Sequence, residues 1–185
     1  MTTRTFVLAS LLAFTAIPAA AAITVLGDSS ARLCYEAAEF GRTSARTGLE
    51  RCNQALREDG TTHNEIVATY VNRGILKLRM GQVDPAIADF DEAIAQDDDE
   101  AEAYLNKGIA MLRDENRRSD AVGLFDAALQ KRTRKPALAH YARAVSHELN
   151  GRLKDAYLDY RQANRLDPEW EDPKEQLARF TVRQN

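Results

Sequence analysis

A period of about 35 residues constrains this chain more than any other feature of its sequence. Three series of positions recur at that step, and each is small or aromatic in all three copies: Ala86, Ala121 and Ala156; Phe90, Phe125 and Tyr160; Ala93, Ala128 and Ala163. Such a period is typical of arrays in which each repeat is one supersecondary unit that buries its apolar face against its neighbours.

Each copy is expected to form two helices joined by a turn. The Ala, aromatic, Ala series has spacings of four and three residues, which place all three side chains on one face of a helix. The preceding helix carries a small residue in each copy, at Gly74, Gly108 and Ala144. Glycine inside a helix costs helix propensity, so its recurrence indicates a close packing contact.

The turns and helix starts fit the same frame. Gly81, Asn116 and Gly151 fall between the two helices, where the left-handed conformation that ends a helix favours glycine or asparagine. Thr62 and Glu65 have the spacing of a capping box, and Pro136 marks a later start. We therefore expect helices at 64–80 with 83–96, 100–115 with 118–132, and 136–150 with 153–166.

The pattern resembles the tetratricopeptide repeat family over roughly residues 66–170. The matching segments are Tyr70-Val71-Asn72-Arg73-Gly74 with Ala86, Phe90 and Ala93; Tyr104-Leu105-Asn106-Lys107-Gly108 with Ala121, Phe125 and Ala128; and Ala144 with Ala156, Tyr160 and Ala163. The resemblance implies an all-α solenoid of helix-turn-helix hairpins over residues 64–170. The sequence departs from the family pattern in two ways. Asp98 and Thr133-Arg134 stand where the family has a closing proline. The middle copy has an extra residue, which we expect in its first helix near Asp114.

The N-terminus has the composition of an export signal. Residues 6–17 are almost unbrokenly apolar, Pro18 ends that run, and alanines 19–22 suit a cleavage site. We interpret residues 1–22 as a signal peptide cut after Ala22. A membrane anchor is the alternative, but the apolar run is shorter than the roughly 20 residues that span a bilayer. The expected location is therefore the bacterial periplasm, without membrane attachment after cleavage.

Two end segments complete the predicted array. Residues 23–63 are expected to hold a degenerate hairpin, in which Gly48, Cys52 and Ala55 keep the four-three spacing. Cys34 and Cys52 are the only cysteines, and an oxidising compartment favours a disulfide between them over a metal site or a catalytic thiol. Residues 171–185 are expected to form a capping helix that covers the last hairpin with Leu177 and Phe180.

No catalytic motif accompanies the repeat, so we expect no enzyme, cofactor or metal. His140 and His147 could share a helix face, but a metal site would need further ligands. The acidic run from Asp97 to Glu100 lacks the spacing and glycine of a calcium loop, and a solvated turn that caps the next helix is the favoured interpretation. The net charge of −3 gives no electrostatic case for nucleic acid.

The resemblance implies that the first helices of the hairpins line a concave, partner-binding side. Carried over by position, the candidate partner-binding residues are Val71, Asn72, Ile75, Arg79, Leu105, Asn106, Ile109, Arg113, Tyr141 and Val145. The amides of the two asparagines could bond the backbone of an extended peptide, and the arginines could bind a carboxylate. We expect both asparagines and both arginines at the surface. For Ile75, Ile109 and Val145, packing between hairpins is an equal alternative.

The sequence thus favours a protein-protein interaction module, an adaptor or assembly factor of the cell envelope that holds a peptide or partner helix in its concave groove. Two alternatives stay open, a self-associating structural envelope protein and an accessory subunit of an envelope enzyme. The sequence leaves the identity of the partner and the oligomeric state undetermined.

Overall fold

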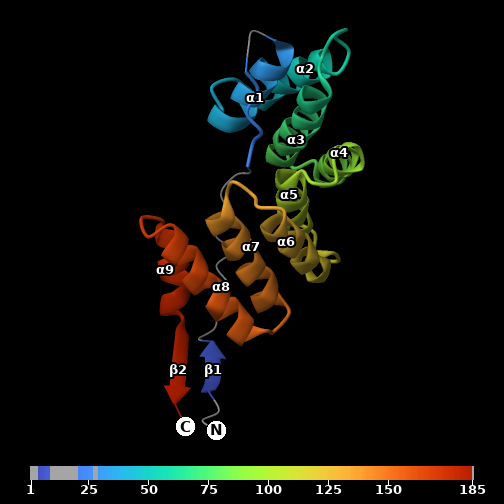
Figure 1. The fold of residues 1–185 in the computed structure, drawn as a ribbon. Helices are drawn as coiled ribbons and strands as arrows, with labels where there is room; N and C mark the ends of the chain where they lie inside the picture. The colour runs from blue at the N-terminus through green and yellow to red at the C-terminus, as the bar shows by residue number, and fades with distance from the viewer. Residues whose placement is uncertain (1–3, 9–20, 27–28, 185) are drawn as a thin grey trace.

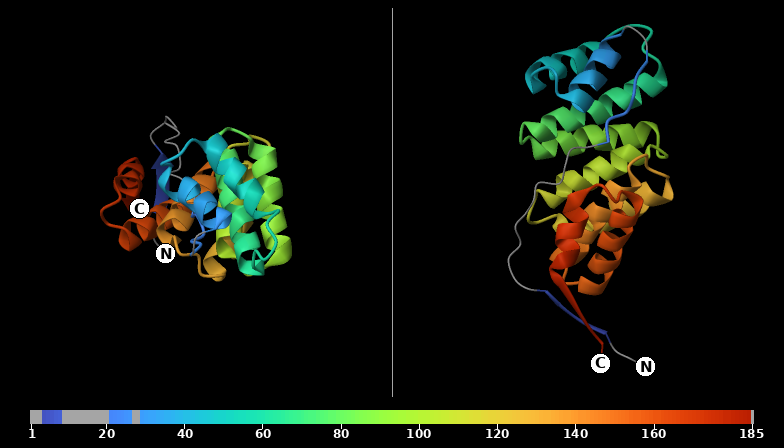
Figure 2. Two further views of the ribbon diagram at one scale, coloured as in Figure 1. Left: turned by 90° about the horizontal axis from the view of Figure 1, so that it is seen from above. Right: turned by 90° about the vertical axis from the view of Figure 1, so that its left-hand side faces the viewer.

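The computed structural model describes residues 4–8, 21–26 and 29–184, and over that part the chain is a column of stacked helix pairs (Figures 1 and 2). The pairs are α1 (Ser30–Phe40) with α2 (Ala45–Ala55), α3 (His63–Arg79) with α4 (Val83–Gln96), α5 (Ala101–Leu112) with α6 (Ala121–Gln130), and α7 (Pro136–Leu149) with α8 (Leu153–Leu166). A 3-10 turn, η1 (Arg118–Asp120), precedes α6, and α9 (Glu171–Ala178) follows α8. The predicted all-α solenoid is confirmed.

The small and aromatic positions of the repeat meet inside each hairpin. Phe90 and Phe125 are fully buried, and each ring packs against the bare backbone of the glycine on the partner helix, Gly74 and Gly108 respectively. An added Cβ at Gly108 would lie 2.6 Å from the Phe125 ring. The period in the sequence therefore reflects a repeated close approach of two helices.

An ion pair occupies equivalent positions in the first and the last of the three repeats. Arg73 on α3 pairs with Asp89 on α4 at 2.7 Å, and Arg143 on α7 pairs with Asp159 on α8 at the same distance. Arg143 also contacts Asp126 of the preceding hairpin at 2.6 Å. Each of these arginines thus holds its own hairpin together, and Arg143 also binds its hairpin to the one before.

The first hairpin is closed by the disulfide. Cys34 on α1 and Cys52 on α2 are bonded with their Cα atoms 4.8 Å apart, and both are fully buried. Gly48 lets α2 approach α1 and α3, because a Cβ there would lie 2.7 Å from the Cβ of Ala37 and 2.9 Å from a methyl group of Leu76. This hairpin joins the same apolar core as the repeats that follow it.

The C-terminal end differs from the expectation of one capping helix over 171–185. The helix α9 ends at Ala178, and β2 (Phe180–Gln184) pairs antiparallel with β1 (Arg4–Leu8) in the register Arg4 with Gln184 through Leu8 with Phe180. The β-branched Thr181 and Val182 favour a strand over a helix. Phe180 and Leu177 do pack on the last hairpin, beside Tyr160.

The middle hairpin corrects two further predictions. The first helix, α5, ends at Leu112, so the extra residue near Asp114 lies in the following loop, where the Asp114 carboxylate accepts the backbone N–H of Asn116 at 2.9 Å. Among the described residues other than glycine, only Arg132 has a positive φ, of 62°. Asn116 is therefore not a left-handed substitute for glycine, because the longer loop makes the turn by another route.

Candidate functional site: an occupied inner face

The first helices α1, α3, α5 and α7 contact one another in sequence along one side of the column, which we call the inner face. Residues Ala21–Leu26, which we call the strap, run against this face in an extended conformation and belong to neither a helix nor a strand (Figure 2, right). The strap joins the main apolar core of the repeats. The inner face therefore holds a peptide segment of this chain itself.

Asn72 on α3 binds the backbone of the strap with both ends of its side-chain amide. The N–H of Ile23 donates to Asn72 Oδ1 at 2.8 Å, and Asn72 Nδ2 donates to the carbonyl oxygen of Ile23 at 2.8 Å. This two-point contact recognises a residue through its backbone alone, as a neighbouring strand in a sheet would. Any residue type other than proline can make it.

Asn106 on α5, at the equivalent position of the next repeat, holds the strap by one bond. Its Nδ2 donates to the carbonyl oxygen of Ala21 at 3.1 Å and to that of Glu102 at 2.8 Å. Its Oδ1 is buried, and no donor among the described residues lies within hydrogen-bond distance of it. Leaving a buried acceptor unpaired costs about 1–3 kcal/mol, so this oxygen favours a donor that the strap does not provide.

The side chains of the strap alternate. Ala21, Ile23 and Val25 are buried, whereas Thr24 is exposed and Leu26 is 83% exposed. This period of two is what an extended peptide shows when one edge of it faces a protein surface.

A hollow of about 610 Å³ opens beside the strap, between residues 23–26 and the start of α3. Its volume lies within the range that is usual for ligand sites in proteins. Its wall includes the carboxylates of Glu65, Asp97 and Glu100. The face is therefore apolar where the strap inserts its side chains and acidic along one margin.

Most of the candidate residues were expected in a free groove but are covered in the structure. The aliphatics Val71, Ile75, Leu105 and Ile109 are buried, with no more than 2% of each residue exposed, and they pack between hairpins. Tyr141 is buried as well, and Val145 is half-buried. These side chains therefore contact mainly the core, and little of their surface is left for a partner.

The expected exposure is wrong for the two asparagines. Asn72 and Asn106 are fully buried, and the strap forms hydrogen bonds with both. No periodic signal in the sequence relates residues 21–26 to the repeats, so the contact is not visible from the repeat pattern. The alternation of the strap is the available signal, and it is hidden among the small residues that indicate a cleavage site.

Arg79 and Arg113 are exposed, as expected, but each holds a neighbouring helix. Arg79 Nη1 donates to the carbonyl oxygen of Ala37 at 3.1 Å, and Arg113 Nη1 donates to that of Leu78 at 2.8 Å. Each acceptor lies in the last turn of the first helix of the preceding hairpin, where Ala37 O also accepts the Gly41 N–H at 3.3 Å and Leu78 O the Gly81 N–H at 3.1 Å. Partial burial lowers the pKa of both guanidinium groups, and both arginines act as helix caps between repeats.

Glu100 caps α5, because its carboxylate accepts the N–H of Glu102 at 3.1 Å. The acidic run thus ends in a helix cap, as the sequence indicates. Burial, followed by the hydrogen bond with the Glu102 side chain, raises the pKa of Glu100 to about 7, while Arg134 opposes the shift.

This raised pKa predicts a pH-dependent stability. Between its ordinary value and about 7, folded Glu100 keeps a proton that the unfolded chain has released, so the free energy of unfolding should fall as the pH rises through that window. Urea unfolding between pH 5 and pH 8, roughly the ends of the window, should show a smaller slope in Glu100→Gln. The control Asp98→Asn, on an exposed residue of the same run, should keep the wild-type slope. An unchanged slope in Glu100→Gln would contradict the assignment.

The histidines of α7 face one carboxylate. His140 Nδ1 lies 2.8 Å from one oxygen of Asp159, and His147 Nε2 lies 3.6 Å from the other. Arg143 already donates to both oxygens of Asp159 at 2.7 Å. In the part of the chain that the structure describes, no group of three His, Cys, Asp or Glu side chains is placed to hold a metal ion.

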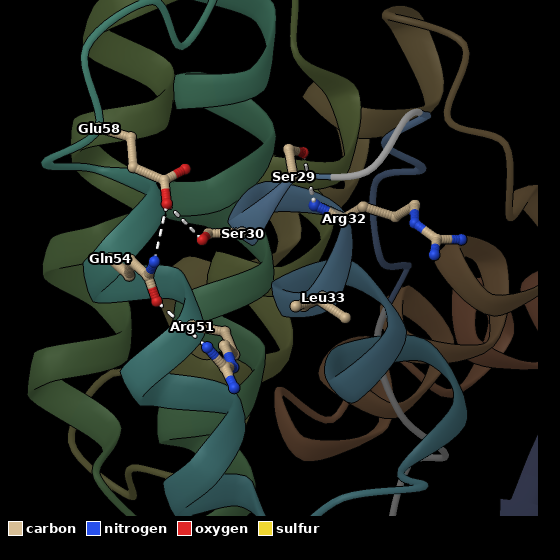
Figure 3. Close-up of a pocket in the computed structure, with 7 residues that line it drawn as sticks. All are labelled: Ser29, Ser30, Arg32, Leu33, Arg51, Gln54 and Glu58. Atoms are coloured by element: carbon tan, nitrogen blue, oxygen red, sulfur yellow. Dashed lines mark hydrogen bonds between the residues drawn. The ribbon is translucent and has the colours of Figure 1, made fainter.

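A second cavity, of about 420 Å³, lies on the first hairpin (Figure 3). Its polar groups bond to one another: Glu58 accepts from Ser30 Oγ at 2.6 Å and from Gln54 Nε2 at 2.9 Å, and Gln54 accepts from Arg51 at 3.2 Å (Figure 3). Because these groups satisfy one another, the cavity is a weaker candidate than the inner face. None of the helices described is both long and apolar enough to span a bilayer.

Comparisons with known proteins follow the same architecture. A model of the family described as tetratricopeptide repeat matches residues 71–116 and 111–169. No curated protein matches the chain.

Similar solved structures include PilW, titled a widely conserved type IV pilus biogenesis factor, with 20% identity, a TM-score of 0.69, and coverage of 81% of this chain and 66% of that one. MamA from Desulfovibrio magneticus RS-1 is 19% identical with a TM-score of 0.64, over 83% of this chain and 84% of that one. TTC0263, a thermophilic protein from Thermus thermophilus, is 19% identical with a TM-score of 0.63, over 80% and 78%. At these identities the likeness concerns the fold alone.

Proposed function

We propose that this chain, which belongs to the tetratricopeptide repeat family, binds an extended segment of another protein on its inner face and serves as an adaptor or assembly factor in the cell envelope. The family generally provides non-catalytic protein-interaction modules. The proposed guest is a peptide in extended conformation, held through its backbone by Asn72 and Asn106. The aliphatic residues of the repeats shape the surface beneath it but lie mainly in the core.

The observation that carries this proposal is the pair of 2.8 Å bonds between Asn72 and Ile23. They supply a bound example of an extended peptide on the inner face, with its backbone hydrogen-bonded and alternate side chains buried. Asn106 supports the proposal further, because its unpaired Oδ1 offers a peptide N–H one more bond than the strap makes. A guest that uses both asparagines fully gains that extra bond.

The envelope location rests on the export signal inferred for residues 1–22, most of which lies outside the described residues. A disulfide in the first hairpin supports an oxidising compartment. The likeness to PilW, a pilus biogenesis factor by its title, supports an assembly role.

The test is crosslinking in intact cells, followed by identification of the attached protein. Asn72→Ala combined with Asn106→Ala should weaken capture about three- to tenfold. While Ala21 is present, the guest loses one more hydrogen bond than the strap, and one such bond contributes about 0.5–1.5 kcal/mol. Far-UV circular dichroism should stay unchanged. The matched control is Asn116→Ala with Asn150→Ala, which changes two exposed asparagines in turns and should capture the partner normally. Equal capture by both double variants would overturn the proposal.

A further inference from the structure

We infer that the strap is an intramolecular occupant of the peptide site, so that a guest binds only when residues 21–26 leave the inner face. This inference rests on the proposed function and adds a means of regulating it. The strap is the only ligand-like segment that the described residues place on α3 and α5. Its contacts therefore also describe the peptide that would replace it.

The strap has the chemistry of a bound guest. It is extended, it exchanges two backbone hydrogen bonds with Asn72, and it buries Ala21, Ile23 and Val25 while Thr24 points outward. A replacement peptide should accordingly carry small or β-branched aliphatic residues at alternate positions. Its other side chains would face solvent.

The strap is also bound incompletely. Asn106 Oδ1 has no donor among the described residues, although Asn106 is fully buried beneath the strap. Leu26 is 83% exposed, so the last strap residue adds little contact. These features are those of a segment that competes with a guest peptide for the inner face but binds weakly enough for the guest to displace it.

Its attachment to the chain gives the strap an advantage over a free peptide. Only two residues separate Leu26 from Ser29, the N-cap of α1. A short tether of this kind gives an effective concentration on the order of millimolar. A free peptide of the same sequence must overcome that concentration.

The inference also holds for a processed chain. If the leader is cut after Ala22, Ile23 becomes the first residue, and its amine can still donate to Asn72 Oδ1 while its carbonyl accepts from Nδ2. The bond from Asn106 to Ala21, the burial of Ala21 and the pairing of β1 with β2 are lost. The Asn72 half of the face then stays occupied, and the amide of Asn106 gains capacity to bond the guest at both of its ends.

The experiment releases the strap by mutation and measures the binding of a separate peptide that has the sequence of the strap. In the full chain, Ile23→Asp with Val25→Asp places two charges at buried positions beside Glu65, Asp97 and Glu100, which should expel the strap. The probe is a fluorescent, end-blocked hexapeptide with the sequence of residues 21–26. Fluorescence polarisation should show that the release variant binds it at least about tenfold more tightly than the wild type does.

The matched control is Thr24→Asp with Leu26→Asp. It adds the same charge at outward-facing positions of the same segment and should bind the probe as weakly as the wild type. Adding Asn72→Ala to the release variant should abolish the gain. Intact mass checks that all variants are processed alike, and circular dichroism checks their helicity.

Three results would overturn the inference: no gain in the release variant, an equal gain in the control, or a gain that survives Asn72→Ala. Light scattering adds a fourth, a wild-type dimer that the release variant converts to monomers, because the strap would then bind between two copies. Two further outcomes distinguish the strap inference from the proposed function. If the release variant binds the probe but captures no partner in cells, only the proposed function is rejected. If the wild type and the release variant capture the partner equally, only the strap inference is rejected.

Discussion

Loss of the Cys34–Cys52 disulfide is expected to lower the free energy of unfolding by about 3 kcal/mol. The bond closes a loop with a sequence separation of 18 residues, and in the chain-entropy model a loop of that length contributes stabilisation of that size. The variant is Cys34→Ala with Cys52→Ala, because alanine leaves no polar group in a fully buried site. Urea unfolding under oxidising conditions measures the difference.

The effect should be local as well as large. The first hairpin is at one end of the column and has one neighbouring hairpin, so hydrogen exchange should quicken first in α1 and α2. Reduced wild type is the control, and it should unfold within about 1 kcal/mol of the double variant, since both lack the crosslink. A loss smaller than about 1 kcal/mol, or one spread evenly to α8, would contradict a stapling role.

The second prediction concerns Gly108, where the structure leaves no space for the methyl group of an alanine side chain. Overpacking in Gly108→Ala should cost about 1–3 kcal/mol, which leaves a net destabilisation of up to about 2 kcal/mol after the gain in helix propensity is subtracted. The new Cβ would lie 2.6 Å from the Phe125 ring, which is fully buried and held by its neighbours in the core. The intrinsic gain in helix propensity, about 1 kcal/mol, works against this loss and is the smaller effect.

Gly123 supplies a control of opposite sign. It lies within the helix α6, and a Cβ there would meet no atom within 4 Å. Gly123→Ala should therefore stabilise the protein by up to about 1 kcal/mol. If ring contact is the cause, Gly108→Ala should cost less in a Phe125→Leu background than in the wild type. Stabilisation by Gly108→Ala alone would show that the hairpin opens more easily than its packing indicates.

The repeat makes the fold predictable from sequence because its signal is local. Phe125, Gly108 and their equivalents recur at a nearly fixed step, and each of them packs within a single hairpin. Capping chemistry is local too: Thr62 and Glu65 form the expected box, in which Glu65 Oε2 accepts the Thr62 N–H at 2.9 Å. Both kinds of feature depend on spacing, which a sequence displays directly.

The candidate site is predictable only in part, because its decisive contact is long-range. The repeat identifies Asn72 as a candidate for binding a peptide backbone, but its bond to Ile23 spans 49 positions and follows no period. The same limit applies to Arg79 and Arg113, whose repetition suggests ligand binding but whose acceptors belong to the preceding hairpin. Repetition of a polar residue marks a recurring contact without saying whether the contact is with a guest or with the next repeat.

The contacts of Arg79 and Arg113 also give the array a direction. Each guanidinium reaches toward the N-terminus and closes the end of an earlier first helix. Truncation before α5 would strip α3 of the contact from Arg113, whereas removal of α1 and α2 would leave Arg79 in water. For these two contacts, truncations from the two ends are therefore unequal.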